Sequence, residues 1–313
     1  MSYPSMRTEQ LSTQQYREGI MAGSTVILAR AITLVESQLE SDQAQAQELL
    51  ESLNPVNNSI RIAISGVPGV GKSTFIEAFG KYLTSQNHKV AVLAVDPSST
   101  KSHGSILGDK TRMDELSKDP NAFVRPTATG GRLGGVASRT RETILLCEAA
   151  GYDIIIVETV GVGQSEITVR SMVDFVLLLM LGGAGDELQG IKKGIIEIAD
   201  GIAINKADGD NIAHAKKAQA ELSHALHLVS SVSKVLICSA ITKTGLKEIW
   251  NMIEEFMKKG TWIENRQHQQ EAWLKEAVTE LFLNAAKSIN YNFSNVSGFP
   301  PTIARELFKQ LIK

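Results

Sequence analysis

From residue 60 onward, short runs of consecutive apolar residues alternate with longer stretches in which apolar residues recur at helical spacing. The short runs are continuously apolar, which is typical of parallel strands covered on both faces. They predict strands at 60–64, 89–95, 122–124, 153–159, 175–181, 201–205 and 234–238, with helices at 73–84, 136–150, 188–199, 211–228 and 246–258. This order predicts an α/β fold with a doubly wound, mostly parallel sheet. Functional groups are then expected at the carboxyl ends of the strands.

The two ends of the chain carry only helical patterns. Residues 15–53 predict two or three helices, the last ending at Asn54-Pro55, and these either cover the main domain or contact a partner. From residue 261 an apolar stripe that includes Trp273, Leu281 and Phe282 either packs on the chain's own domain or forms a dimer arm. The pattern predicts a helical extension over 1–58, a central α/β domain over 59–260 and a helical arm over 261–313.

The first predicted strand leads into a glycine-rich loop. Its sequence fits G-x-x-x-x-G-K-[ST], in which glycines let successive N–H groups point at phosphate oxygens and the following helix adds its positive end. Lys72 is expected to reach the β- and γ-phosphates, and the Ser73 hydroxyl to hold Mg²⁺. The residues predicted to bind the nucleotide here are Gly66, Val67, Pro68, Gly69, Val70, Gly71, Lys72, Ser73 and Thr74.

Three carboxylates lie at positions that suit a metal. Asp96 ends the second strand, Asp109 lies in a glycine-containing loop, and Glu158 ends the strand 153–159 just before Gly161. Each has a simpler interpretation, as a turn-forming Asp-Pro, a surface carboxylate and a solvated strand end respectively. We expect all three to bind Mg²⁺ with Ser73, and with Lys72 to form the catalytic group.

The sequence N-K-A-D follows the strand 201–205 and suits a guanine base. The Asp208 carboxylate can accept hydrogen bonds from N1–H and the exocyclic amine of guanine, whereas adenine offers neither and would leave the carboxylate unpaired. Asn205 would tie this loop to the phosphate loop, and the Lys206 stem would lie on the base plane. After the next strand, backbone N–H groups would meet the guanine O6 from Ser239, Ala240 and Ile241.

Two further glycine-rich segments have open roles. Residues 182–194 are interpreted as a switch in which Gln189 and Lys192 share one face of a turn, or else as a flexible connection. Residues 130–135 have basic neighbours that contact phosphate or a partner, or are simply solvated. These neighbours are Arg125, Arg139 and Arg141.

Composition narrows the class of protein. The net charge is −2 over 313 residues, so nothing suggests a nucleic-acid partner. Only two cysteines are present, Cys147 and Cys238, far apart, which indicates a reducing compartment. The longest apolar run, 175–181, is too short to span a bilayer, and the first ten residues lack an apolar signal core. A cytoplasmic location without membrane contact is expected.

Taken together, these segments resemble the MeaB/ArgK/MMAA family of P-loop GTPases, the chaperones of adenosylcobalamin-dependent methylmalonyl-CoA mutase. The resemblance covers about residues 15–290. It rests on GVPGVGKST (66–74), AVDPSS (94–99), GDKTRM (108–113), RTRET (139–143), ETVGVGQSE (158–166), GGAGDELQGIKKGI (182–195) and NKAD (205–208). The loop GVPGV and the run TATGGR (127–132) depart from the common family sequence, the second at a place where a partner would bind.

The resemblance implies a SIMIBI-type G domain over 59–260 and a dimerisation arm over 261–313. It implies a homodimer that binds GTP or GDP with Mg²⁺ and hydrolyses GTP slowly until the mutase, or a related acyl-CoA mutase, activates it. The cycle would gate cofactor loading and protect the mutase.

Two other functions fit parts of the sequence less well. A kinase linked to arginine/ornithine (LAO/AO) transport would prefer ATP, which Asp208 argues against. A nickel-insertion GTPase would need a Cys/His cluster, and His103 has no cysteine neighbour.

Overall fold

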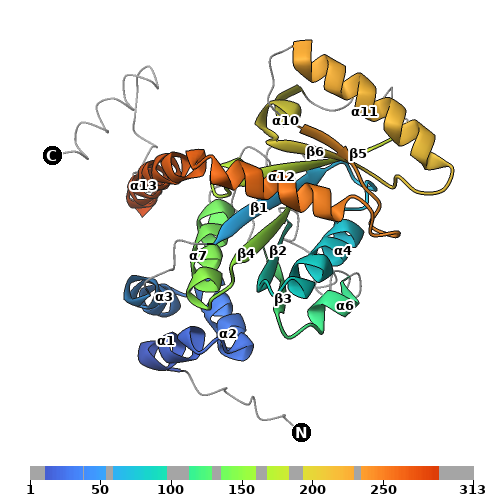
Figure 1. The fold of residues 1–313 in the computed structure, drawn as a ribbon. Coiled ribbons are helices and arrows are strands. Elements are labelled where there is room, and N and C mark those ends of the chain that lie inside the picture. The colour runs from blue at the N-terminus through green and yellow to red at the C-terminus, as the bar shows by residue number, and fades with distance from the viewer. Residues whose placement is uncertain are drawn as a thin grey trace, which may run out of the picture. The chain divides into compact units, whose positions relative to one another are not determined.

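Seven strands form one sheet in the order β3-β2-β4-β1-β5-β6-β7, and every pairing among the described strands is parallel (Figure 1). The computed structural model describes residues 11–37, 39–53, 59–96, 113–128, 135–159, 168–182, 193–228 and 234–288. The parallel sheet confirms the predicted doubly wound α/β fold. The strands are β1 (Ile60–Gly66), β2 (Val90–Asp96), β3 (Ala122–Ala128), β4 (Ile154–Thr159), β5 (Phe175–Leu181), β6 (Gly201–Asn205) and β7 (Lys234–Ile237).

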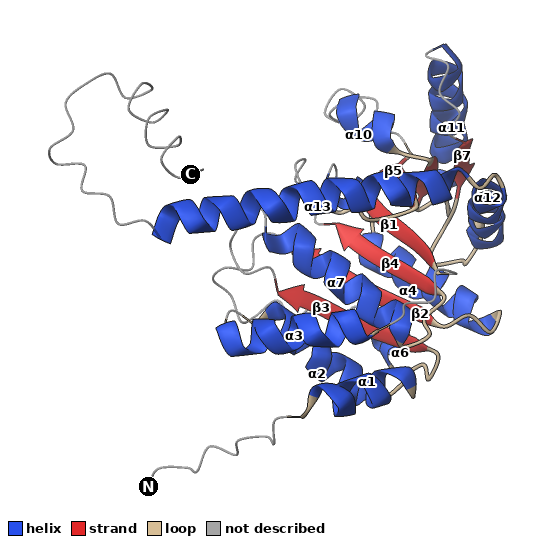
Figure 2. Ribbon diagram, turned by 90° about the vertical axis from the view of Figure 1, so that its left-hand side faces the viewer, coloured by secondary structure: helices blue, strands red, loops and turns tan. Residues whose placement is uncertain are grey.

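Helices cover both faces of this sheet, because each buried strand presents apolar side chains to both sides. Ile62 and Ile64 of β1 pack on the face covered by α4 (Lys72–Ser85), α6 (Asp114–Ser117) and α12 (Leu246–Lys258). Ala63 faces the other side. That side is covered by α1 (Thr13–Met21), α2 (Thr25–Glu36), α3 (Glu40–Ser52) and α7 (Gly135–Ala149), and farther along by α10 (Lys193–Ile198) and α11 (Asn211–Leu228) (Figure 2).

The N-terminal helices are a cover on the main domain, as one of the two interpretations expected. Ser12 and Gln15 form a capping box that starts α1, and Ser24 caps α2. Ile20, Leu28 and Ile32 are fully buried in the same core as α7. The predicted end at Asn54-Pro55 lies outside the described residues.

Two arginines beside the glycine-rich segment 130–135 bind this helical cover. Arg125 donates to Thr33 Oγ1 at 3.0 Å and to Glu36 Oε2 at 3.1 Å. Arg139 donates to the carbonyl of Glu36, at the C-terminal end of α2 where cations are stabilised. Arg141 donates to Ser171 Oγ at 2.6 Å. The three arginines are therefore not simply solvated, and their contact with phosphate or a partner stays a prediction.

The edge strand β3 is longer than predicted. It extends to Ala128 rather than Val124 and pairs Pro126 with Ala94 of β2. Proline lacks a backbone N–H, so a strand can hold it at a sheet edge, where one side needs no donor. The short helix α6 was not predicted, and Glu77 of α4 accepts hydrogen bonds from the backbone N–H groups of Glu115 and Leu116 in it.

The chain divides into two compact units, Met1–Gln267 and His268–Lys313. The helix α13 (Thr261–Ser288) begins in the first unit. Within the described residues no helix is both long and apolar enough to cross a bilayer. The cytoplasmic location stays a prediction.

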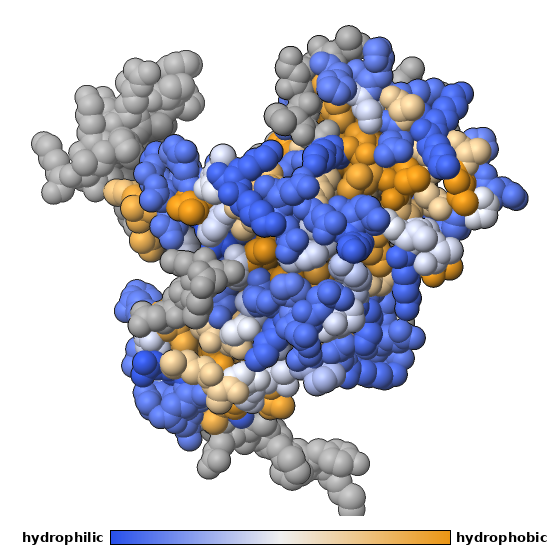
Figure 3. Space-filling view, in the orientation of Figure 1, coloured by the Kyte–Doolittle hydropathy of each residue, from blue (hydrophilic) through white to orange (hydrophobic). Residues whose placement is uncertain are grey.

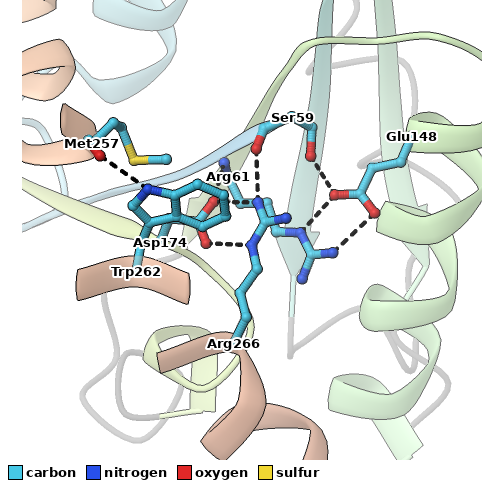
Figure 4. A network of polar contacts seen from close by, with 7 residues as sticks. All are labelled: Ser59, Arg61, Glu148, Asp174, Met257, Trp262 and Arg266. Atoms are coloured by element: carbon cyan, nitrogen blue, oxygen red, sulfur yellow. Dashed lines mark hydrogen bonds and ion pairs between the residues drawn. The ribbon is translucent and has the colours of Figure 1, made fainter. Parts of the chain in front are cut away.

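A network of buried charges fixes the amino-terminal edge of the sheet (Figure 4). Arg266, in the first turns of α13, donates to both oxygens of Asp174 at 2.6 and 2.7 Å and to the Ser59 carbonyl at 2.7 Å. The backbone N–H of Arg61 donates to the same carboxylate at 2.9 Å, and the Arg61 side chain binds both oxygens of Glu148 at 2.8 and 2.9 Å. The side chains of Asp174 and Glu148 are fully buried.

The charge of Arg266 is retained despite this burial. Desolvation lowers the pKa of Arg266, but the hydrogen bonds and charge of Asp174 outweigh it, and the pKa stays above its ordinary value. The guanidinium also lies 4.7 Å from the centroid of the Trp262 ring. The network joins the starts of β1 and β5 to the end of α7, so the opposite ends of these strands are held in a fixed relation.

Breaking this pair should destabilise the chain. Asp174→Asn leaves the Arg266 guanidinium buried without its carboxylate, and we expect the free energy of unfolding to fall by about 3–5 kcal/mol in urea denaturation. Lys118→Met, which breaks the exposed pair with Asp114, is the control and should cost less than about 0.5 kcal/mol. An Asp174→Asn protein as stable as the Lys118→Met protein would contradict a stabilising network.

Candidate functional site

The phosphate loop joins β1 to α4, as predicted. Gly71 is the N-cap residue of α4 and has φ +95°, a left-handed conformation that other residues rarely adopt. A Cβ atom there would lie 3.0 Å from Asn205 Nδ2 and 3.6 Å from Lys206 Cε. Glycine thus lets the loop approach the end of β6, and the first N–H groups of α4 carry no side-chain cap from Gly71. Such a helix start suits an anion.

The Lys72 ammonium lies across the phosphate loop. Its Nζ donates to the carbonyl of Gly66 at 2.7 Å and to that of Val67 at 3.3 Å. The cation is therefore held at the same loop whose glycines and helix start favour negative charge. This arrangement can neutralise the charge of a bound polyphosphate.

The predicted metal-binding residues are only partly described. Ser73 Oγ donates to Glu158 Oε1 at 3.1 Å, so these two oxygen groups lie together. Glu158 is beside Ile64 of β1 on one side and Ala94 of β2 on the other. Asp96 ends β2, which pairs with β4, and its backbone therefore lies at the same carboxyl edge. Asp109 lies outside the described residues.

The predicted base-binding loop is tied directly to the phosphate loop. Asn205, which is 2% exposed, donates from Nδ2 to the carbonyl of Val70 at 3.0 Å. Lys206 has φ +59° and donates from Nζ to the carbonyl of Gly69 at 2.9 Å. These two bonds join the carboxyl end of β6 to the loop after β1, although 135 and 137 residues separate the partners.

Asp208 is held by Ser239, the second residue after β7. The Ser239 hydroxyl donates to Asp208 Oδ2 and accepts from the backbone N–H of Thr242 at 3.1 Å. Ser239 is fully buried, whereas Ile241 is 75% exposed. The structure therefore places Ser239 beside Asp208, whereas the predicted base contacts of Ala240 and Ile241 stay predictions. A fixed carboxylate can accept from a base carrying two adjacent donors.

Sequence reasoning missed the part played by the side chain of Cys238. Its Sγ lies 3.7 Å from Asn205 Oδ1, and its carbonyl accepts from the N–H of Ala207 at 3.0 Å. Burial raises the pKa of the Cys238 thiol to about 12, so it stays protonated at neutral pH and can donate to Asn205. No local pattern reveals this, since the two residues come from neighbouring strands.

The glycine-rich segment after β5 is described only at its ends. β5 ends at Leu181, and the helix predicted for 188–199 is present as α10 from Lys193 to Ile198. A Cβ atom on Gly182 would lie 2.7 Å from Ala215 Cα of α11, so the start of the segment packs closely on that helix. Gln189 and Lys192 lie outside the described residues, and their switch role stays a prediction.

The profile of the family described as "Methylmalonyl Co-A mutase-associated GTPase MeaB" matches residues 28–290. The chain belongs to this family. It is 48% identical over 272 residues to the "GTPase ArgK" of Escherichia coli, covering 84% of this chain and 82% of that protein. It is 46% identical over 307 residues to the "Methylmalonic aciduria type A homolog, mitochondrial" of Mus musculus, covering 90% and 74%.

A similar solved structure supports the fold over most of the chain. It is described as "Crystal structure of LAO/AO transport system kinase" and superposes with a TM-score of 0.75 at 37% identity, covering 96% of this chain and 98% of that one. The fold is that of a P-loop GTPase, and the protein is a GTPase that binds guanine nucleotides. The resemblance found in the sequence is thereby confirmed.

Proposed function

We propose that this GTPase reads guanine through Asp208, binds phosphates and Mg²⁺ at the other end of the site, and serves as the chaperone of an adenosylcobalamin-dependent acyl-CoA mutase. The observation that carries the base-reading role is the hydrogen bond from Ser239 to Asp208. It fixes the carboxylate beside a loop that Asn205 and Lys206 attach to the phosphate loop. A carboxylate held in this way needs little reorientation to accept hydrogen bonds from guanine. Adenine offers no donors at these positions and would leave the carboxylate unpaired.

The phosphates are proposed to bind residues 66–74. The N–H groups at the start of α4 would face the phosphate oxygens, and the Lys72 ammonium would exchange its loop carbonyls for the β- and γ-phosphates. Catalysis would then rest on charge neutralisation and positioning rather than on a covalent intermediate.

The chemistry of the described groups fits Mg²⁺, which prefers oxygen ligands and keeps several waters. The hydroxyl of Ser73 would hold the ion, with Glu158, 3.1 Å from that hydroxyl, acting directly or through a water. The ion would stabilise negative charge on the departing phosphate. Asp96, at the same carboxyl edge, and Asp109 stay predicted members of this group, and Gln189 and Lys192 predicted members of a switch.

The mutase role is supported by the family description, which names a methylmalonyl-CoA mutase-associated GTPase. Loss of the γ-phosphate would release the segments that contact it, and a partner could sense that change. A kinase of LAO/AO transport is the alternative, since the similar solved structure carries that name. That function predicts transfer of phosphate to a protein acceptor, whereas the proposed one predicts release to water.

A homodimer is proposed through the arm 261–313, with 59–260 as the GTPase domain and 1–58 as its helical extension. On α13 the large apolar side chains Leu274, Val278, Leu281 and Phe282 are exposed at helical spacing, and Figure 3 shows apolar surface on this helix. A stripe of this kind is typical of helix pairing. A second copy of the chain supplies a matching stripe.

Base preference should follow Asp208. Asp208→Asn loses the acceptor for the guanine amine but gains an N–H that can donate to the carbonyl of xanthine. We expect the affinity for GTP to fall about 10- to 100-fold and that for XTP to rise, measured by calorimetry. Asp210→Asn, at an exposed carboxylate two residues away, should change neither. Wild-type chain that binds ATP as tightly as GTP would contradict guanine reading.

Hydrolysis should depend on Mg²⁺ through Ser73. Chelation by EDTA is expected to stop phosphate release, and Ser73→Ala should raise the Mg²⁺ concentration for half-maximal release at least about 10-fold. Ser85→Ala, at the other end of α4, is the control and should behave as wild type. Equal Mg²⁺ dependence in the Ser73→Ala and wild-type proteins would remove Ser73 from the metal site.

Assembly is tested by gel filtration with light scattering. The chain alone should give twice the 33.9 kDa mass of one copy at micromolar concentration. Leu281→Asp should give single chains, whereas Val26→Asp, at a similarly exposed residue of α2, should not.

Added methylmalonyl-CoA mutase should elute with the wild-type dimer to an extent that differs between GDP and a GTP analogue. A single-chain mass would contradict the dimer, and no association in any nucleotide state would contradict the mutase role.

A further inference from the structure

The turn from Ser239 to Gly245 closes on itself directly behind the base-reading carboxylate. The Ser239 N–H donates to the carbonyl of Thr244 at 3.0 Å, and these two residues form an antiparallel bridge. The Ser239 hydroxyl accepts from the Thr242 N–H at 3.1 Å while it donates to Asp208. The turn therefore fixes both the backbone N–H and the side-chain hydroxyl of Ser239, and with them the direction in which the hydroxyl points.

Gly245 closes the turn and starts α12. It has φ +77°, and a Cβ atom on it would lie 2.2 Å from the carbonyl oxygen of Ile237 and 3.0 Å from Cys238 Cα and Cβ. Real Cβ atoms do not approach a backbone oxygen so closely, so any side chain at 245 forces the end of β7 and the start of α12 apart. The closure thus requires glycine at this residue for space as well as for conformation.

We propose that Gly245 is a positioning residue for base specificity: its lack of a side chain lets α12 start directly against the Ile237–Cys238 backbone, which places Ser239 to hold Asp208. The inference rests on the proposed guanine-reading role of Asp208. It adds a residue that lies outside the phosphate loop and the N-K-A-D loop.

Two connections carry a displacement at Gly245 to the base site. One runs from Cys238 to Ser239 and on to the Asp208 carboxylate. The other runs from the Cys238 carbonyl to the Ala207 N–H, next to Asp208, at 3.0 Å. Lys72 and Ser73 belong to α4 and share neither connection. The phosphate loop is linked to Cys238 by the longer, 3.7 Å contact of its Sγ with Asn205 Oδ1, and Asn205 donates to Val70. A defect at Gly245 should therefore weaken base discrimination far more than phosphate binding.

The test compares Gly245→Ala with Gly260→Ala. Gly260 has φ +76°, nearly the same as Gly245, but a Cβ atom on it would meet nothing within 4 Å. Both variants therefore carry the strain of a left-handed alanine, and only one carries the clash. The measurement is the ratio of dissociation constants for ITP and GTP, because inosine lacks only the exocyclic amine that Asp208 is proposed to bind.

In the wild-type chain the ratio should favour GTP. Gly245→Ala is expected to lower the ratio at least about 5-fold, mainly by weakening GTP, while the affinity for inorganic triphosphate stays within about twofold. Gly260→Ala should leave both quantities within about twofold of wild type. A folded Gly245→Ala protein that keeps the wild-type ratio overturns the proposal.

Because Gly245→Ala can also unfold the chain, circular dichroism is recorded for each variant, and Thr244→Gly serves as a second variant. Thr244 is exposed, and glycine there loosens the same turn without a clash. Should Gly245→Ala fail to fold, a ratio lowered at least about threefold in Thr244→Gly supports the proposal, and an unchanged ratio overturns it.

Asp208→Ala separates this inference from the function on which it rests. If Asp208→Ala keeps the wild-type ratio, Asp208 does not read the base and both fail. If Asp208→Ala loses the preference for GTP while a folded Gly245→Ala protein keeps it, only the role of Gly245 is overturned.

Discussion

The amide of Asn205 is the contact on which the proposed nucleotide site depends. One side of the amide donates to Val70 in the phosphate loop, and the other lies 3.7 Å from the thiol of Cys238, the residue after β7. The side chain is buried, so an acceptor left without its donor would cost about 1–3 kcal/mol. A phosphate-binding loop and a base-binding loop can read one nucleotide only if their separation is fixed, and this side chain fixes it through neighbouring parallel strands.

The polar contacts at the amino ends of the strands differ in kind from those at the carboxyl ends. At the amino-terminal edge, buried charges pair with each other, as Asp174 does with Arg266, and no ligand is needed to satisfy them. At the carboxyl edge, Lys72 is held by loop carbonyls and Ser73 by Glu158, contacts that phosphate and a metal ion can replace. Firm pairing at one edge lets the other edge keep groups that exchange partners without loss of the fold.

How much could be predicted from the sequence depended on how local the signal was. The continuous apolar runs gave β5 and β6, and the helical spacing gave α11 and α12, at the predicted bounds. The phosphate loop was predictable because glycine and lysine act within nine consecutive residues. The contacts of Arg125 and Arg139 with α2 were not predicted, because the partners lie 89 to 103 residues away in the sequence. Asp174 and Arg266 are separated by 92 residues and carry no joint pattern.

The proposed base specificity depends strongly on contacts between residues that lie far apart in the sequence. The motif at 205–208 supplies the carboxylate, but its orientation depends on Ser239, and that of Ser239 depends on backbone groups of Thr242 and Thr244. Those groups are positioned by the close start of α12. If Asp208 reads the base as proposed, the energy that separates guanine from adenine or inosine is only partly a property of the residues that touch the base. It also depends on the turn behind them, since a carboxylate free to rotate would hydrogen-bond to water and lose its selectivity.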